Sequence, residues 1–167
     1  MFTTLKEFEE DWNHESTSTL KMLNALTDTS LSQPVVDGHR TLGRIAWHIV
    51  TTIPEMADKM GIPLDSVKED APVPATAKEI TDAYLKVSKE LIDRIKLDWD
   101  DDTLQTEVDM YGERWKRTFG LKACIEHQIH HRGQMTVLMR QAGVRVPGTY
   151  GPAKEDWEEN GMEPPQV

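Results

Sequence analysis

Four long segments of this chain repeat their apolar residues at intervals of three and four, which is the spacing of one face of an α-helix. They cover residues 2–26, 41–60, 76–99 and 118–142. No segment shows a convincing pattern for a sheet. Because amphipathic helices of this length bury their apolar faces best against one another, the pattern predicts an all-α protein, a four-helix bundle.

Local signals mark the ends of these helices. Thr41 is the expected N-cap of the second helix, and Thr76-Ala77-Lys78-Glu79 has the pattern of a capping box at the start of the third. Gly61 and Gly143 are expected just after the second and fourth helices. Pro54 is expected to kink the second helix or to divide it.

The remaining segments connect the helices. Tyr111-Gly112-Glu113 is interpreted as the turn of a small hairpin inserted before the last long helix. An irregular tail is expected from about residue 143, with a short helix around residues 155–159. The 167 residues, 38% of them hydrophobic, suit one core of ordinary size. We therefore predict a single domain that spans residues 1–167.

The charge of the chain argues against two classes of partner. Its 19 Lys and Arg residues stand against 29 Asp and Glu residues, for a formal net charge of −10, which favours neither nucleic acid nor an anionic membrane surface. No segment approaches the roughly 20 apolar residues of a membrane helix, and the N-terminus lacks the apolar core of a signal peptide. Cys124 is the single cysteine and can form no disulfide within the chain. We expect a cytoplasmic protein.

The fourth helical segment carries two histidines at a spacing that suits metal binding. Its apolar stripe reads Cys124, His127, His131, Met135, Leu138 and Ala142. His127 and His131 lie four residues apart on this face, so both imidazoles are expected to point into the bundle, where an unpaired polar group is costly. A divalent metal would satisfy both. The candidate third ligand is His48, at the edge of the apolar stripe of the second helix.

Other interpretations of these residues stay open. Histidines four residues apart also occur on helices as ordinary capped or water-bonded residues. His130 projects roughly 80° from the midpoint of the pair, which places it behind the ligands or on the surface, and a His127/His130 pair is an alternative. Cys124 could supply a thiolate, although a small buried core residue is its commoner role.

The first helical segment turns polar in the middle of its apolar stripe, at Glu15, Ser16 and Thr19. These residues could line a pocket beside the metal. A hydrated defect in the core, or a slight error in the phase of the helix, would explain them equally well.

The histidine pair lacks the base of a metalloprotease. The H-E-x-x-H motif needs a glutamate directly after the first histidine, whereas Gln128 follows His127 here and Glu126 projects away from the pair. No nucleophile-elbow, Walker or dinucleotide-binding motif occurs either. Peptide hydrolysis is therefore disfavoured.

Two stretches of the chain resemble a known family. Residues 126–134, EHQIHHRGQ, followed by LMRQAG at residues 138–143, are similar to the last bundle helix of the DinB-like metal-binding superfamily, whose first members were named as DNA-damage-inducible. TLGRIAWHI at residues 41–49 resembles the second helix of that family, with its histidine in place. The tail, residues 146–157, gives weaker support.

The resemblance implies an up-down-down-up four-helix bundle, often dimeric, with a divalent metal held by one histidine of the second helix and an H-x-x-x-H pair of the last. Carried over by position, the ligands are His48, His127 and His131. Some relatives are transferases or isomerases that use low-molecular-weight thiols, and many others have no assigned reaction. We expect a homodimer with a small-molecule substrate, such a thiol being one candidate.

These observations favour a metal-dependent enzyme. Three neutral imidazoles leave a coordination position for water or a thiol. The cation, with zinc or nickel favoured, would lower the pKa of that water or thiol. The enzyme would be a thiol S-transferase or a hydrolase, and the missing glutamate base favours thiol chemistry. No catalytic side chain is assigned. The alternatives are a non-catalytic metal- or ligand-binding protein of a stress response, and a plain bundle with histidines in its core.

Overall fold

The four predicted segments are helices in the computed structural model, which describes residues 1–166. The elements in chain order are α1 (Leu5–Asn24), η1 (Asp28–Ser32), α2 (Leu42–Lys59), α3 (Ala77–Asp98), η2 (Asp102–Gln105), β1 (Glu107–Met110), β2 (Glu113–Lys116), α4 (Arg117–Gln141) and α5 (Lys154–Glu159). The predicted all-α bundle is confirmed, as is the short helix in the tail. Two short 3-10 helices, η1 and η2, were not predicted.

Threonine hydroxyl groups begin three of the long helices. Thr4 accepts a hydrogen bond from the backbone N–H of Glu7 at 3.2 Å and forms a capping box with it. Thr76 and Glu79 form the predicted box at the start of α3, and Thr41 caps α2 as predicted. Each cap satisfies backbone donors that the first turn of a helix leaves without a partner.

The predicted helix ends also agree with the structure, and of the two outcomes expected at Pro54 the division of the helix does not occur. Gly61 and Gly143 follow α2 and α4 with φ angles of 84° and 71°, values that suit glycine best. Pro54 lies inside α2 and does not divide it. Pro54 is buried, and this burial offsets the backbone hydrogen bond that proline cannot donate.

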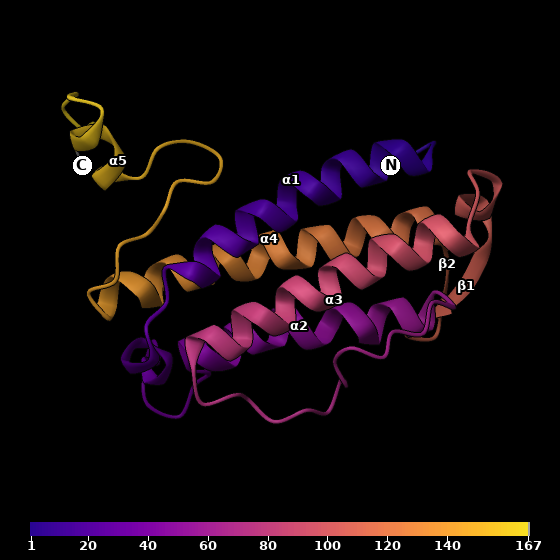
Figure 1. Ribbon diagram of the computed structural model, residues 1–167, viewed down its shortest axis with the longest axis horizontal. Coiled ribbons are helices and arrows are strands. Elements are labelled where there is room, and N and C mark those ends of the chain that lie inside the picture. The colour runs from indigo at the N-terminus through magenta and orange to yellow at the C-terminus, as the bar shows by residue number, and fades with distance from the viewer. Residues whose placement is uncertain (167) are drawn as a thin grey trace.

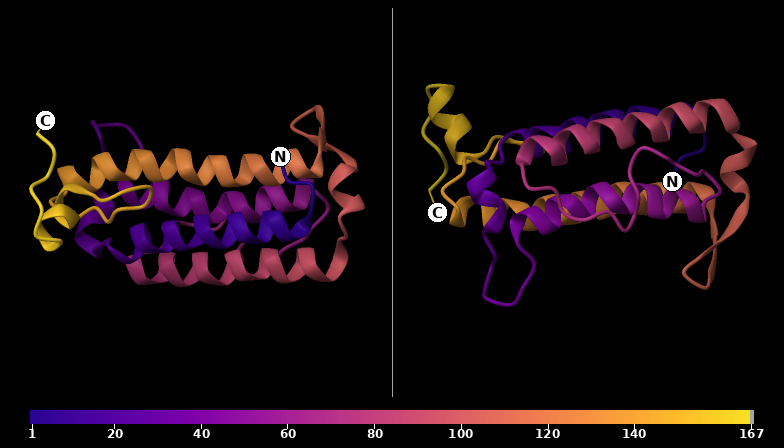
Figure 2. Two further views of the ribbon diagram at one scale, coloured as in Figure 1. Left: turned by 90° about the horizontal axis from the view of Figure 1, so that it is seen from above. Right: turned by 60° about the horizontal axis from the view of Figure 1, so that its bottom comes forward.

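The direction of the helices gives an up-down-down-up bundle (Figure 1). α1 and α4 run one way and α2 and α3 run the other, because the long connection between α2 and α3 returns along the bundle (Figures 1 and 2). α1 packs beside α3 and α4, and α2 packs beside the same two helices. The second and fourth helices are therefore adjacent and antiparallel.

The predicted hairpin is present before α4. β1 and β2 pair antiparallel, with Met110 opposite Glu113, so the turn is Tyr111-Gly112 and Glu113 already belongs to the second strand. Tyr111 and Gly112 have φ angles of 59° and 87°. Two successive positive φ angles are typical of the tight turn that matches the twist of a hairpin.

The core contains the apolar stripes that the periodicity predicts. All six stripe residues of α2 are buried: Leu42, Ile45, Ile49, Ile53, Met56 and Met60. The same holds for the large residues of the predicted α3 stripe, which are Ile80, Tyr84, Val87, Leu91 and Ile95. Within residues 1–166, no helix is long and apolar enough to cross a membrane.

Polar side chains of α1 and α4 meet inside the bundle. Arg132 forms an ion pair with the carboxylate of Glu15 and donates hydrogen bonds to the Glu15 carbonyl oxygen at 2.7 Å and to the Thr19 hydroxyl at 2.9 Å. The side-chain oxygen of Gln128 accepts hydrogen bonds from Tyr84 at 2.6 Å and from Thr19 at 3.3 Å. The polar break in the α1 stripe is thus the partner of a buried polar face on α4.

The tail after α4 folds back onto this network. The Tyr150 hydroxyl donates to the Glu15 carboxylate at 2.6 Å and accepts from Arg132 at 2.8 Å. Farther along, Arg145 pairs with Asp156 of α5 at 2.9 Å. The predicted irregular tail is therefore attached to the bundle at Tyr150.

Replacement of Glu15 tests how far the bundle depends on this buried ion pair. The side chains of Glu15 and Arg132 are only 9% and 4% exposed. Glu15→Leu leaves a buried guanidinium without its carboxylate, and we expect it to lower the free energy of unfolding by about 3–5 kcal/mol in urea denaturation. The double variant Glu15→Leu/Arg132→Met removes both charges and is expected to recover a large part of that loss. This account is contradicted if the double variant loses as much free energy of unfolding as Glu15→Leu and Arg132→Met lose together when measured singly.

Candidate metal centre

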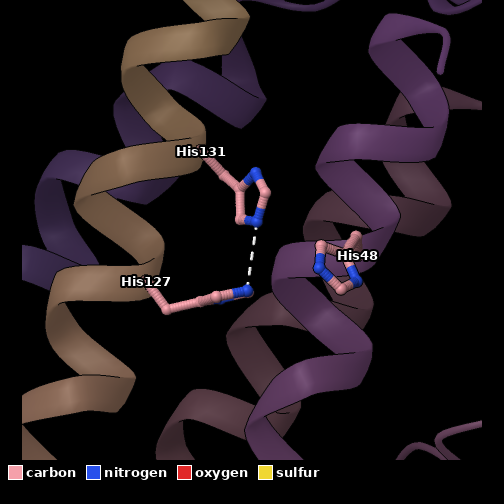
Figure 3. Close-up of side chains that lie close together, drawn as sticks. All are labelled: His48, His127 and His131. Atoms are coloured by element: carbon pink, nitrogen blue, oxygen red, sulfur yellow. Dashed lines mark hydrogen bonds between the residues drawn. The ribbon is translucent and has the colours of Figure 1, made fainter. Parts of the chain in front are cut away.

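Two neighbouring helices bring three histidines together. His127 and His131 project from α4 and His48 from α2, and the three imidazoles face one another in the close-up (Figure 3). One ring nitrogen of each lies within 4.8 Å of the other two, and the Nε2 atoms of His127 and His131 are 3.0 Å apart. Within residues 1–166, these three histidines are the potential ligands that lie close enough together to share one ion.

The cluster lies in the groove between α2 and α4 rather than in the middle of the bundle. His131 is buried, with 6% of its surface exposed, whereas His48 and His127 are half-buried. The expectation that both α4 histidines point into the interior is therefore only partly right. The interior face of α4 at this level carries Gln128 and Arg132, and their partners on α1 and α3 fill that space.

Hydrogen bonds hold two of the imidazoles by their Nδ1 atoms. Nδ1 of His131 lies 2.7 Å from the side-chain oxygen of Gln134, and Nδ1 of His48 lies 3.3 Å from the Thr52 hydroxyl. That hydroxyl already donates its proton to the His48 carbonyl oxygen at 2.7 Å, so it accepts from the ring. Both rings therefore carry hydrogen on Nδ1 and direct the lone pair of Nε2 outwards, which is the arrangement of metal-binding histidines.

The electrostatic environment keeps the three rings neutral. Burial, together with the neighbouring imidazoles, lowers the pKa of both His48 and His127 from 6.5 to about 4. Burial also lowers the pKa of His131. The positive charge of Arg40 lowers the pKa of all three rings as well. At neutral pH no proton competes for the lone pairs that a metal would use.

The donor set fits a divalent metal. Without a metal, the two Nε2 atoms 3.0 Å apart form one hydrogen bond, in which one ring donates its N–H to the lone pair of the other, whereas a cation accepts the lone pairs of both rings. Two nitrogens bound to one zinc ion at about 2.0–2.1 Å stand roughly 3.3 Å apart in a tetrahedron, close to the distance seen here. The ligand nitrogen of His48 lies within 4.8 Å of those of the other two histidines.

The other predicted site residues lie outside the cluster. His130 is exposed, and its Nε2 is 3.1 Å from the amide nitrogen of Gln134, so it lies behind His131. Cys124 is buried, and burial raises the pKa of its thiol to about 12, which suits a core residue rather than a thiolate ligand. The prediction that Glu15, Ser16 and Thr19 line a pocket beside the metal is not supported. Their partners are Arg132, Tyr150, Gln128 and the Asn13 carbonyl oxygen.

A cavity of about 460 Å³ opens beside the cluster. Its lining residues come from α2, from α4 and from the loop between η1 and α2: Val35, His39, Arg40, Ile45, His131, Gln134, Val137 and Leu138. Sequence reasoning missed Gln134 and Arg40. Gln134 could have been found, because it lies one helical turn after His131. Arg40 gave no signal, because it belongs to a loop whose path only the folded chain reveals.

The chain was compared with known proteins. The model of the DinB family matches residues 1–164. The chain belongs to the DinB family. It is 45% identical to the uncharacterized protein YrdA of Bacillus subtilis (strain 168) over 167 residues, which cover 100% of both chains. The DinB assignment thus agrees with the resemblance of the histidine motifs.

Solved structures of DinB-like proteins share the fold. The crystal structure of a DinB-like protein from Bacillus cereus ATCC 10987 matches with a TM-score of 0.87 and 47% identity, over 90% of this chain and 100% of that one. The DinB-like protein YjoA of Bacillus subtilis matches with a TM-score of 0.68 over 88% of this chain and 99% of that one. At 14% identity, the second match supports the fold alone.

The depressed pKa values predict how acid affects the metal-free protein. Between pH 6.5 and about 4 the unfolded chain protonates His48 and His127 while the folded chain does not, so stability falls as the pH falls through this window. Urea denaturation with a chelator present, at about pH 7, 6 and 5, should show this decline. His48→Asn should make the profile flatter, whereas His39→Asn, in the exposed loop, should leave it unchanged. A stability that is constant from about pH 6.5 to 5 would contradict the prediction.

Proposed function

We propose that this protein is a divalent-metal-dependent enzyme that activates a thiol for attack on a small-molecule electrophile. The observation that carries the proposal is the meeting of three neutral imidazoles, one of which, His131, lines a cavity. A structural metal site closes its coordination shell with protein ligands, whereas a catalytic site keeps a position open. Three ligands beside a cavity match the second kind.

The chemistry of such a site follows from the charge of the ion. His48, His127 and His131 would hold a divalent cation, which would lower the pKa of a thiol or a water molecule bound beside it. In the transferase reaction the sulfur forms a new bond to the electrophilic carbon, the thiol proton goes to solvent, and the leaving group departs with its bonding electrons. Gln134 and Thr52 act as positioning residues, because their oxygens hold the imidazoles of His131 and His48.

Thiol chemistry is favoured over hydrolysis by the lining of the cavity. A hydrolase of this type usually needs a carboxylate or another base to take a proton from water. Among residues 1–166, those that line the cavity include no aspartate or glutamate. A free thiol, with a pKa of about 8.5, needs less help to ionise than water does.

The homodimer that the family resemblance implies stays a prediction.

Metal binding can be tested directly on protein purified without a histidine tag. After dialysis against zinc or nickel, elemental analysis should give about one metal ion per chain, and His48→Ala, His127→Ala and His131→Ala should each remove most of it. His130→Ala is the matched control and should retain the metal. Less than about 0.1 ion per chain in the unaltered protein would overturn the metal site.

The reaction is tested on the same metal-loaded protein. Incubation with a low-molecular-weight thiol and an alkylating electrophile should give a rate above that of His131→Ala. Metal uptake with no turnover across a broad panel of thiols and electrophiles would support the alternative, a non-catalytic metal- or ligand-binding protein.

The role of Gln134 predicts a separate effect on affinity. Gln134→Leu removes the oxygen that accepts from Nδ1 of His131, and losses of this kind weaken metal binding by about 10–100-fold. Competition with a chromophoric chelator measures the change. Gln141→Leu, an exposed substitution two turns farther along α4, is the matched control. Equal affinities for the two variants would show that Gln134 does not position the ligand.

A further inference from the structure

The cavity beside the three histidines contains a positive charge that the proposed reaction does not yet use. Arg40 lines it from the loop that precedes α2. Among the described residues, no carboxylate forms an ion pair with Arg40 and no hydrogen bond holds its guanidinium group. Most other arginines of the chain do have such partners, as Arg132, Arg140 and Arg145 show.

The cavity has a polar part and an apolar part. Arg40, Gln134 and His131 supply its nitrogen and amide groups. His39 also lines the cavity, and the rest of the wall is aliphatic and comes from Val35, Ile45, Val137 and Leu138. Val35 and Val137 are each 50% exposed, so apolar surface lies open at the rim. Such a cavity suits a small molecule with an apolar body and one charged group.

The charges around the cavity favour the binding of an anion. Three neutral imidazoles leave the two positive charges of a bound cation uncompensated, and Arg40 adds a third. Among the side chains that the structure describes, no acidic residue lines the cavity. The whole chain carries a net charge of −10, so this attraction is local and acts over about one Debye length, roughly 8–10 Å.

We propose that the cavity binds a small organic carboxylate, whose carboxylate group pairs with Arg40 and whose reactive end faces the three histidines. The inference rests on the proposed function, because the metal site defines which end reacts. A guanidinium group matches a carboxylate with two parallel hydrogen bonds, which selects for shape as well as for charge. The aliphatic wall contacts the apolar body between the two ends.

The loop that carries Arg40 is anchored at both ends. Pro34 and Thr41 form a β-bridge, and the backbone N–H of Leu42 donates to the Gln33 carbonyl oxygen at 2.8 Å. Arg40 is the last residue before Thr41, the N-cap of α2, so its backbone is fixed next to the helix that carries His48. This arrangement orders the backbone before a ligand arrives and lowers the entropic cost of binding.

The test compares thiols that differ only in charge. Cobalt(II) replaces the native metal, since a thiolate bound to cobalt gives a charge-transfer absorption that reports binding without turnover. The probes are mercaptoacetate, 3-mercaptopropionate and 4-mercaptobutyrate, each beside its neutral amide. We expect at least one carboxylate to bind about tenfold more tightly than its amide.

Variants of two arginines identify the group responsible. Arg40→Gln should abolish the preference for the carboxylate with unchanged cobalt content, and Arg40→Lys should retain part of it because the charge remains. Arg44→Gln is the matched control, because Arg44 is exposed nearby in the first turn of α2 and does not line the cavity. It should keep the full preference.

The outcomes separate the two proposals. Failure to take up cobalt, or cobalt uptake with no thiol signal, contradicts the proposed function. Binding of every carboxylate and its amide with equal affinity overturns the carboxylate inference alone. Equal losses in Arg40→Gln and Arg44→Gln also overturn it, because a general electrostatic effect would then explain the preference.

Discussion

Burial of a single guanidinium group determines how α4 is rotated in the bundle. Arginine keeps its charge in a protein, so Arg132 can lie inside only where a carboxylate meets it. Glu15 of α1 supplies that carboxylate, and Thr19 and Tyr150 complete the contacts. Successive residues of a helix point about 100° apart. With Arg132 turned towards α1, His131 is therefore turned towards α2.

This rotation places the histidines where chemistry can use them. In the middle of the bundle, three imidazoles would be dry and beyond the reach of a substrate. In the groove between α2 and α4 they are buried enough to stay neutral, His48 and His127 are half-buried, and His131 lines a cavity. Partial burial thus provides both the free lone pairs and the access that a metal site with an open position needs.

The sequence predicted most of the secondary structure because the signals for it are local. A capping threonine, a positive-φ glycine and an apolar period of 3.6 residues act within one or two turns of the chain. The 3-10 helices were missed because they are short and have no period. The meaning of Glu15 was missed for another reason: its partner, Arg132, is distant in sequence, and no local pattern connects the two.

The sequence by itself determined the four helices, the order in which they follow, and the spacing that puts His127 and His131 on one face of α4. Only the tertiary structure decided that this face is half-open, that His48 of α2 meets it, and that Arg40 lies beside the cavity. The physical reason is the range of the interactions. Hydrogen bonds along a helix depend on neighbours in sequence, whereas burial and charge compensation depend on which helices meet.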